Sequence, residues 1–289
     1  MDEIRIEFSR FSAFYSPLIL TMAGGFLKEE GLDYKYTIST PARTAMEGVL
    51  QGDVDVAQSA VSAGFASVAQ GRQPEVAHFA QINETDGFFL MARSPDPDFV
   101  WSNLEGKDVL VDHGGQPMAM FKYACLKAGL DYKKIKPIDA GDPEQMEEVF
   151  RSGVGDYIHA QGPLPQQLQY EGVGYVVASV GKAIGPVAFS TLAAKPQWLE
   201  TDTAQCFMRA YREARQLAIL GSAKEIADIE ASFFPNIHVE ALAETIAIYQ
   251  SLGCWTPHIE ITRSAFEVAV DVFLHSGVIS RRLPYELAV

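Results

Sequence analysis

The chain has 289 residues, of which 48% are hydrophobic, so it can bury one large core or two of ordinary size, and disorder is excluded as its main state. With 23 Lys and Arg against 37 Asp and Glu, the formal charge is −14, the wrong sign for gripping nucleic acid or an anionic membrane. Cys125, Cys206 and Cys254 are far apart, so we predict buried free thiols rather than a disulfide framework or a cysteine zinc site.

The uncharged run at residues 11–27 has the length of a signal sequence or a membrane span. It contains Pro17, two glycines and several hydroxyl side chains, and acidic residues precede it. We therefore interpret it as part of the fold and expect no membrane insertion. An exported form would need a leader ahead of this chain, so two localisations stay open: a periplasmic mature form with its leader removed, or a cytoplasmic protein.

Strand and helix signals alternate through the first part of the chain. Strands are predicted at residues 4–8, 32–38, 54–58 and 76–81. Ser16-Pro17 and Thr40-Pro41 each join an N-cap residue to a first-turn proline, which predicts helices ending at the glycines 31 and 52; a further helix stops near residue 71. This succession with short connections is typical of a mostly parallel sheet covered on both faces.

The pattern resumes after residue 107 as a second α/β unit. Strands are predicted at 109–112, 135–139 and 156–160, and helices at 116–128 and 144–151. From residue 203 the pattern is helical, at 203–220, 239–252 and 262–275, with a further helix that Ser222 and Glu225 begin as a capping box.

The apolar extended segments 87–93 and 187–194 bracket the second unit. We predict that they are crossovers between two lobes, one formed by residues 1–90 plus 188–289 and the other by residues 91–187. An internal repeat supports this division, because GLDYK at 31–35 recurs at 129–133, and residues 52–59 align with 155–162. The two matches need a five-residue gap between them, so coincidence stays the alternative.

The signatures of common hydrolases, nucleotide-binding proteins and zinc proteases (GxSxG, Walker A, GxGxxG, HExxH) do not occur in the sequence, although this does not exclude an enzyme. What recurs is a strand ending in a small or hydroxyl residue just before a helix. Such ends direct free backbone amides toward one point, which suits anions or polar ligand groups. In open α/β sheets, ligands bind at the carboxyl ends of the strands.

We therefore predict a ligand cleft where the strand ends of the two lobes face each other. The candidates from the first lobe are Phe11, Ser12, Tyr15, Thr40, Arg43, Gln58, Ser59, Ser62, Gln81 and Asn83. The candidates from the second lobe are Asp112, His113, Gly114, Gly115, Gln116, His159, Gln161 and Gly162. No catalytic residue, metal ligand or cofactor is predicted.

Structural roles compete for several of these residues. The hydroxyls of Thr40, Ser59 and Ser62 are of the kind that caps helices, and the glycine pair at 114–115 also suits a tight turn. Arg43 either faces solvent or clamps a carboxylate, sulfonate or phosphate. His113 is the histidine that we expect to contact ligand.

Two further motifs are given structural interpretations. His159 lies on a predicted strand, so we expect an interior residue. The segment CWTPH at 254–258 holds a Cys and a His in a loop without a third partner, which favours a structural role over catalysis.

Four ordered segments carry a resemblance to a known family: FLKEEGLD at 26–33, GDVDVA at 52–57, LEGK at 104–107 and GVGDYI at 153–158. Together they resemble the ABC-transporter solute-binding proteins for nitrate, taurine and aliphatic sulfonates, in one superfamily with thiamine-pyrimidine binding proteins and fungal-type pyrimidine synthases. The resemblance covers essentially the whole chain. It implies a type II periplasmic-binding-protein fold, with two α/β lobes, two crossovers and a ligand in the cleft.

The resemblance implies a non-enzymatic solute-binding protein that captures a small polar or anionic organic molecule, with an ABC transporter permease as partner if the protein is exported. The lobes would close through hinges at residues 88–92 and 189–193. Helix amides at Ser59 and Gly114 would bind an anionic or carbonyl group, Gln58, Asn83 and Gln161 would orient polar edges, and Phe11, Tyr15 and Phe89 would pack the apolar part.

Three departures from the family keep alternatives open. The cysteine cluster of the pyrimidine synthases is missing, residues 160–163 read AQGP where many relatives place an aromatic residue, and an export leader is missing. The alternatives are an enzyme on the same fold, of pyrimidine-synthesis, desulfinase or decarboxylase type, and a cytosolic ligand sensor. Sulfonate, nitrate-like anion, carboxylate and aminopyrimidine each suit the named groups, and the oligomeric state is open.

Overall fold

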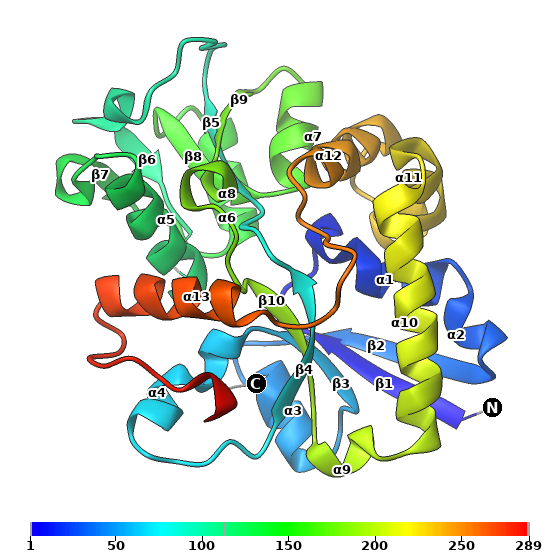
Figure 1. Cartoon of the computed structure of the whole chain (residues 1–289). Helices are drawn as coiled ribbons and strands as arrows, with labels where there is room; N and C mark the ends of the chain where they lie inside the picture. Colours follow the sequence, from blue (N-terminus) through cyan, green and yellow to red (C-terminus); the bar gives the residue numbers. More distant parts are fainter. Residues whose placement is uncertain (1, 113, 288–289) are drawn as a thin grey trace.

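The computed structural model describes residues 2–112 and 114–287. Within these residues the strands form two five-stranded sheets with helices packed around them (Figure 1). The α/β class predicted from the sequence is therefore confirmed.

The first sheet has the strand order β2-β1-β3-β10-β4. Its strands are β1 (Asp2–Phe8), β2 (Leu32–Ile38), β3 (Val56–Ser59), β4 (Ala77–Asn83) and β10 (Ser190–Ala194). β1 is parallel to β2 and β3, whereas β10 is antiparallel to β3 and β4. Every residue of β3 and β10 is buried, as expected for central strands covered on both faces.

The second sheet has the equivalent order, β7-β6-β8-β5-β9. Its strands are β5 (Phe88–Ala92), β6 (Asp108–Leu110), β7 (Lys136–Ile138), β8 (Tyr157–Gln161) and β9 (Tyr175–Ser179). β6 is parallel to β7 and β8, and β5 is antiparallel to β8 and β9. In each sheet the fourth strand is therefore antiparallel to its two neighbours.

Helices cover both sheets. Those of the first and last parts of the chain are α1 (Ser16–Ala23), α2 (Phe26–Glu29), α3 (Ala45–Gln51), α4 (Phe65–Ala69), α9 (Pro196–Leu199), α10 (Asp202–Leu220), α11 (Ala223–Glu230), α12 (Val239–Ser251) and α13 (Arg263–His275). Those of the middle part are α5 (Gly115–Lys127), α6 (Pro143–Arg151), α7 (Leu164–Tyr170) and α8 (Val180–Ile184). α13 packs against α5 and α12 against α7, so C-terminal helices bridge the two halves (Figure 1).

The chain passes between the sheets twice, from β4 to β5 and from α8 to β10 (Figure 1). The segments predicted as crossovers contain these strands: β5 lies within 87–93 and β10 within 187–194. Side chains tie the first passage in place, because buried Tyr249 donates its hydroxyl to Gly87 O at 2.9 Å and Asn83 donates Nδ2 to Phe14 O at 2.6 Å. The residue bounds given above for the two lobes stay a prediction.

The helix predicted to start at Thr40 and end at Gly52 is present and has Gly52 as its C-cap, but its predicted start is wrong. Thr40 forms an isolated antiparallel bridge with Arg43, and α3 begins only after Thr44. The Thr44 side chain accepts a hydrogen bond from Glu47 N, and the Glu47 carboxylate accepts one from Thr44 N. This reciprocal capping box satisfies two helix-end donors, more than a Thr-Pro pair offers, and it decides the start of the helix.

The single helix predicted from residue 16 to residue 31 is two helices. α1 ends at Ala23, and Gly25 has a φ of 82°, a left-handed conformation that glycine adopts freely and that interrupts the helix before α2. Most of α1 is buried, so the uncharged run belongs to the core as predicted. Across residues 2–112 and 114–287, no helix is long and apolar enough to cross a membrane.

The internal repeat corresponds to equivalent strands, but in a different register. Asp55 N donates to Arg5 O and Asp156 N donates to Asp108 O, and the carboxylates of these two aspartates accept from Arg5 N and Asp108 N. Asp55 and Asp156 are therefore equivalent, two positions away from the sequence alignment, which paired Asp156 with Asp53. The strand register places Gln58 opposite Phe8 in the first sheet, the position that His159 takes in the second.

Candidate functional site

Two neighbouring pockets open where the carboxyl ends of β1, β3, β6 and β8 meet. The first, about 450 Å³, includes the start of α5, and the second, about 540 Å³, includes the start of α6; we name them the α5 pocket and the α6 pocket. Both are lined by Ser9, Arg10 and Gln161. Each pocket has lining residues from both sheets, so the pair forms one interlobe cleft.

The remaining linings differ in chemistry. The α5 pocket is lined mainly by neutral hydrogen-bonding groups and aromatic rings: Tyr15, Gln58, Ser59, Ser62, Phe88, Gly114, Gly115, Gln116, Phe189 and Ser190. The α6 pocket carries acidic and apolar groups: Phe11, Ser12, Ile38, Asp112, Asp142, Glu144, Met146, Glu147, His159, Leu164, Phe234 and Ile237.

An ion pair joins the two lobes inside the cleft. Arg10, which follows β1, places Nη1 2.5 Å from Oδ2 of Asp112, which follows β6. Burial opposes the charge on both groups, yet the hydrogen bond and charge of Arg10 hold the pKa of Asp112 below its ordinary value, and Asp112 raises the pKa of Arg10. Both groups are therefore ionised at neutral pH, and Arg10 is the one cation in the described lining of either pocket.

The N-terminus of α5 faces the α5 pocket. Gly114 is its N-cap residue and has no side chain to cap the helix, while its own N–H donates to Asp112 Oδ1 at 2.9 Å. The first amides of a helix have no partner within the helix, and the helix dipole adds positive potential there. A Cβ on Gly114 would lie 3.0 Å from that carboxylate oxygen, a tight contact that the Asp112 side chain would have to relieve by shifting.

Gln161 has an unused acceptor in the cleft. The residue is 8% exposed, and its Nε2 donates to the Tyr15 hydroxyl at 3.5 Å, but its Oε1 has no hydrogen-bond partner. Gln58, by contrast, is occupied, because its Oε1 accepts from the backbone N–H groups of Ser9 and Arg10. Gln161 is thus the amide that a ligand can reach, while Gln58 shapes the loop after β1.

His159 is fully buried, as predicted, yet it is not satisfied. Its ring stacks between those of Phe88 and Phe121, with centroid distances of 4.6 and 4.7 Å, and neither ring nitrogen has a hydrogen-bond partner. Burial lowers its pKa to about 4, so the ring is neutral at physiological pH.

Further bonds between the lobes surround these groups. Ser12 Oγ donates to Gly162 O at 2.5 Å, and Ser62 Oγ donates to Gln116 Oε1 at 2.7 Å. Gln116 Nε2 in turn donates to Phe189 O, beside β10. Ser12 and Ser62 therefore hold the two lobes together, which differs from the helix-capping role considered for Ser62.

The structure brings most of the predicted site residues together. Phe11, Ser12, Tyr15, Gln58, Ser59, Ser62, Asp112, Gly114, Gly115, Gln116, His159, Gln161 and Gly162 line one pocket or both. The expected ligand contact of His113 concerns a residue outside the described part of the chain.

Five predicted residues line neither pocket. Arg43 pairs with the fully buried carboxylate of Glu7, and Thr40 lies on the exposed turn before α3. Phe89 packs on Tyr249 with a ring distance of 5.8 Å. Asn83, the last residue of β4, donates Nδ2 to Phe14 O, and Gln81 donates Nε2 to Thr256 Oγ1. These side chains are occupied by partners inside the protein or lie outside the cleft, so they are not available to line a pocket.

The sequence reasoning missed Arg10, Phe88, Ser190 and Phe234. Arg10 directly follows the first strand beside the chosen Phe11 and Ser12, so the rule about strand ends was sufficient to find it. Phe88 and Ser190 begin the two strands that cross between lobes, and only the antiparallel placement of β5 and β10 brings those ends to the cleft. Phe234 comes from the segment after α11, which no local pattern connects to the cleft.

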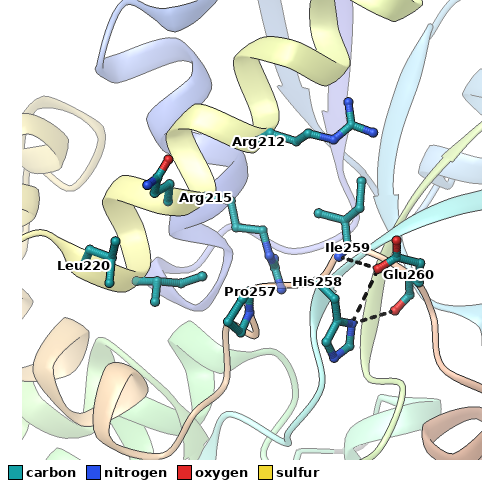
Figure 2. Close-up of a pocket in the computed structure, with 9 residues that line it drawn as sticks. Arg212, Arg215, Leu220, Pro257, His258, Ile259 and Glu260 are labelled. Atoms are coloured by element: carbon teal, nitrogen blue, oxygen red, sulfur yellow. Dashed lines mark hydrogen bonds and ion pairs between the residues drawn. The ribbon is translucent and has the colours of Figure 1, made fainter.

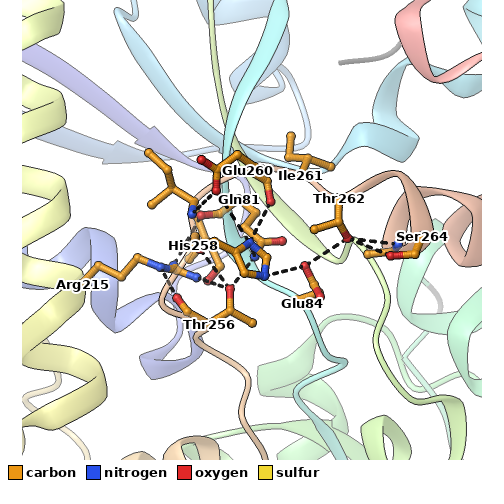
Figure 3. A network of polar contacts seen from close by, with 12 residues as sticks. Gln81, Glu84, Arg215, Thr256, His258, Glu260, Ile261, Thr262 and Ser264 are labelled. Carbon is orange, nitrogen blue, oxygen red and sulfur yellow. Dashed lines mark hydrogen bonds and ion pairs between the residues drawn. The ribbon is translucent and has the colours of Figure 1, made fainter.

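A larger pocket, about 690 Å³, lies away from the cleft, between α10 and the loop at residues 257–260 (Figure 2). Arg215 beside it is 1% exposed and donates Nε to Thr256 O, Nη1 to Ile82 O and Nη2 to Thr256 Oγ1. Gln81 also donates to Thr256 Oγ1, and His258 lies 3.6 Å from Glu84 (Figure 3). These bonds fix the loop to α10 and β4, so we assign this region a structural role.

The three cysteines are free. Cys125 and Cys254 are buried, and burial raises the pKa of Cys125 to about 12, which makes it unreactive. Cys206 is only partly buried, contrary to the prediction, because it lies on the outer side of α10, where Arg209 Nη2 approaches its sulfur to 3.0 Å. In the described ranges no three His, Cys, Asp or Glu side chains are grouped to hold a metal ion.

Comparison with known proteins gives two sequence matches. The family model described as "NMT1/THI5 like" matches residues 14–220. A protein of Bacillus subtilis (strain 168) named "Putative binding protein YtlA" is 30% identical over 293 residues, which cover 100% of this chain and 88% of that protein.

Solved structures share the fold at low identity. The alkanesulfonate-binding protein SsuA from Xanthomonas axonopodis pv. citri, bound to MOPS, is 15% identical with a TM-score of 0.76, covering 100% of this chain and 98% of that one. The periplasmic aliphatic sulphonate binding protein SsuA from Escherichia coli is 16% identical with a TM-score of 0.75, covering 100% and 92%. The periplasmic-binding-protein fold expected from the sequence is thereby confirmed.

Proposed function

Because the chain belongs to the NMT1/THI5 like family, we propose that it is a solute-binding protein that captures a small polar or anionic organic molecule in the interlobe cleft for ABC-type uptake. The observation that carries the proposal is the α5 pocket, whose lining comes from both sheets. A molecule bound there would contact both lobes at once and stabilise their closed arrangement. An ABC transporter permease would recognise that closed form.

The α5 pocket offers complementary groups for such a solute. The amides at the start of α5 suit an anionic or carbonyl oxygen, and the free Oε1 of Gln161 suits a donor. The hydroxyls of Ser59 and Tyr15 orient polar edges, and Phe88 packs the apolar part. The relatives named for alkanesulfonates and aliphatic sulphonates put sulfonates first among the candidate solutes.

We propose binding without chemical conversion. The described lining of the α5 pocket is neutral apart from Arg10, and the nearby carboxylate of Asp112 is engaged by that arginine and by Gly114 N. No group there combines a free general base with a reach to a bound solute. The name of the Bacillus subtilis relative also describes a binding protein.

A solute screen tests the proposal. Sulfonates, nitrate, carboxylates and aminopyrimidines are added at millimolar concentration, and the melting temperature and the radius of gyration are followed. A solute at a hundredfold excess over its Kd stabilises the fold by about 2.7 kcal/mol, so a rise of several degrees is expected, with the solute recovered unchanged.

A matched pair of variants locates the effect. Gln161→Ala should weaken binding of the solute found by about tenfold, because it removes a buried hydrogen-bonding group. Gln51→Ala on α3 is the control, since Gln51 is exposed and lines neither pocket. Absence of any shift across the screen, conversion of the solute, or equal effects of the two variants would overturn the proposal.

A further inference from the structure

The α6 pocket has an acidic wall supplied by one helix end. Asp142 caps α6, Glu144 lies in its first turn, and both line the pocket with exposed side chains. Arg10 is already neutralised by Asp112, and none of the described cations forms an ion pair with Asp142 or Glu144. Asp142 accepts a hydrogen bond from Gln145 N at 2.9 Å, and the charge of Glu144 reaches Arg10. Because Arg10 is bonded to Asp112, however, the wall keeps a net negative charge.

The opposite wall is aromatic and comes from the other lobe. Phe11 and Phe234 both line the α6 pocket, with their ring centroids 5.3 Å apart. Tyr36 and Phe233 stack on Phe11 from behind, at 5.6 and 6.3 Å, and fix its orientation. Aromatic faces carry a negative quadrupole that attracts cations, so both walls favour the same sign of charge.

Buried acceptors without partners lie in the same lining. Gln161 and His159 both contribute to the α6 pocket, both are more than nine-tenths buried, and Gln161 Oε1 and the two ring nitrogens of His159 have no hydrogen-bond partner. A neutral imidazole has one acceptor nitrogen and an amide has its oxygen, and both need N–H donors. Leaving such groups unpaired is costly, so a donor-rich ligand group fits here.

We infer that the α6 pocket binds an organic cation, an ammonium or amidinium group carried on an apolar body. Its acidic side would compensate the charge, the rings of Phe11 and Phe234 would pack the body, and Gln161 would accept an N–H. The inference deepens the proposed function and rests on it for the other end of the solute, which occupies the α5 pocket. The captured molecule is then bipartite, with a polar or anionic end and a cationic end.

Two soluble probes of nearly equal shape test the α6 pocket by itself. Benzylammonium and benzyl alcohol are titrated into the full-length protein by calorimetry at low ionic strength. Benzylammonium is expected to bind about fivefold to tenfold more tightly, from its contacts with the carboxylates and the aromatic faces. In 0.5 M NaCl this preference should fall, because the exposed carboxylates are then screened within a few ångströms, about 4 Å.

Variants distinguish the pocket from the general negative charge of the protein. Asp142→Asn combined with Glu144→Gln should reduce the preference to about twofold or less, and asparagine caps a helix as well as aspartate does. Glu148→Gln combined with Glu75→Gln is the matched control, because it also removes two charges, one of them from the same helix, at exposed residues outside the pocket lining. Phe234→Leu should weaken benzylammonium by about twofold to fivefold.

Equal affinities for the two probes, no binding of either, or a preference that the double variant leaves unchanged would each overturn this inference. The proposed function fails by a different result, namely no response to any polar or anionic solute in the screen. Neither probe carries an anionic end, so the two failures are distinguishable.

Discussion

Arg10 and Asp112 form an ion pair across the interlobe cleft at 2.5 Å, although 102 residues separate them in the sequence. Arg10 follows β1 and Asp112 follows β6, and these strands take the same place in the orders of their two sheets, so two equivalent strand ends face each other. The Asp112 side chain is 7% exposed and the Arg10 side chain 28%, so the carboxylate is shielded from solvent and the guanidinium only partly so. The pair therefore stabilises the arrangement in which the two lobes meet at the cleft.

Asp112→Asn should destabilise the protein by about 2–3 kcal/mol, because the guanidinium of Arg10 then stays half-buried without its counter-charge. The same substitution should favour an open arrangement of the lobes. Urea denaturation gives the first effect and the radius of gyration the second. The double variant Arg10→Met with Asp112→Leu should lose less than the two single changes added together; full additivity would show that the two side chains do not interact.

The stability supplied by Asp112 should depend on pH. Its pKa is lowered in the folded protein, so the contribution is fully present above the ordinary value of 3.8 and is lost as pH falls through the lower folded value. The difference in unfolding free energy between wild type and Asp112→Asn should be constant from pH 5 to 7 and shrink below pH 4. A difference that grows on acidification would contradict this assignment.

Glu230 should make the protein less stable as pH rises. The residue is fully buried, its Oε2 accepts from Ser16 at 2.9 Å, and burial raises its pKa to about 8. Between its ordinary value of 4.5 and about 8, folding retains a proton that the unfolded chain releases, so its contribution falls by up to about 1.4 kcal/mol per pH unit. The unfolding free energy of Glu230→Gln relative to wild type should therefore increase from pH 5 to pH 8; a flat profile would refute this.

Arg215 should be essential for stability and Arg212 should not. Arg215→Ala removes the guanidinium donors from the carbonyl oxygens of Thr256 and Ile82 and opens a cavity between α10 and β4, so a loss of about 3–5 kcal/mol is expected. Arg212 is exposed one turn away, and Arg212→Ala should change stability by about 0.5 kcal/mol or less. Thermal unfolding of both variants is the measurement, and solute affinity should be the same in each.

Thr44 should stabilise α3 while Thr40 contributes little. Thr44→Ala removes one half of the capping box and is expected to cost about 1 kcal/mol. Thr40→Ala, at an exposed residue outside any helix, is the matched control and should be nearly neutral. Equal losses in urea denaturation would mean that the helix start is not decided by Thr44.

Local patterns were reliable where a single segment decides the outcome. The alternating Ile4, Ile6 and Phe8 are buried on β1, and the helix predicted at residues 262–275 is α13, which spans Arg263–His275. Patterns failed where two signals competed within a few residues, as in the Thr40-Pro41 pair against the capping box of Thr44. They also failed where a glycine turn interrupts an apolar run, as at Gly25.

The interlobe cleft shows the same division. Strand ends are readable from the sequence, and Ser12, Ser59 and Gln161, which were predicted from them, line its pockets. The sequence did not show which side chains already have a partner inside the protein. Arg43 has the guanidinium group expected of an anion clamp, but it pairs with the buried Glu7. This contact forms only when β1 and the segment before α3 are packed together. The acidic wall of the α6 pocket comes from the start of α6, and its aromatic wall comes from the loop after β1 and the segment after α11, so no local window contains both.

The sequence by itself determined the alternation of strands and helices, the doubled α/β organisation and the family, because these depend on periodicity and short motifs within one segment. Only the tertiary structure decided which strand ends share a cleft, that β5 and β10 run antiparallel into the sheets, and that Arg10 meets Asp112. The physical reason is that contacts between distant segments depend on the packing of the whole chain, whereas local hydrogen bonding and apolar spacing are fixed by neighbouring residues.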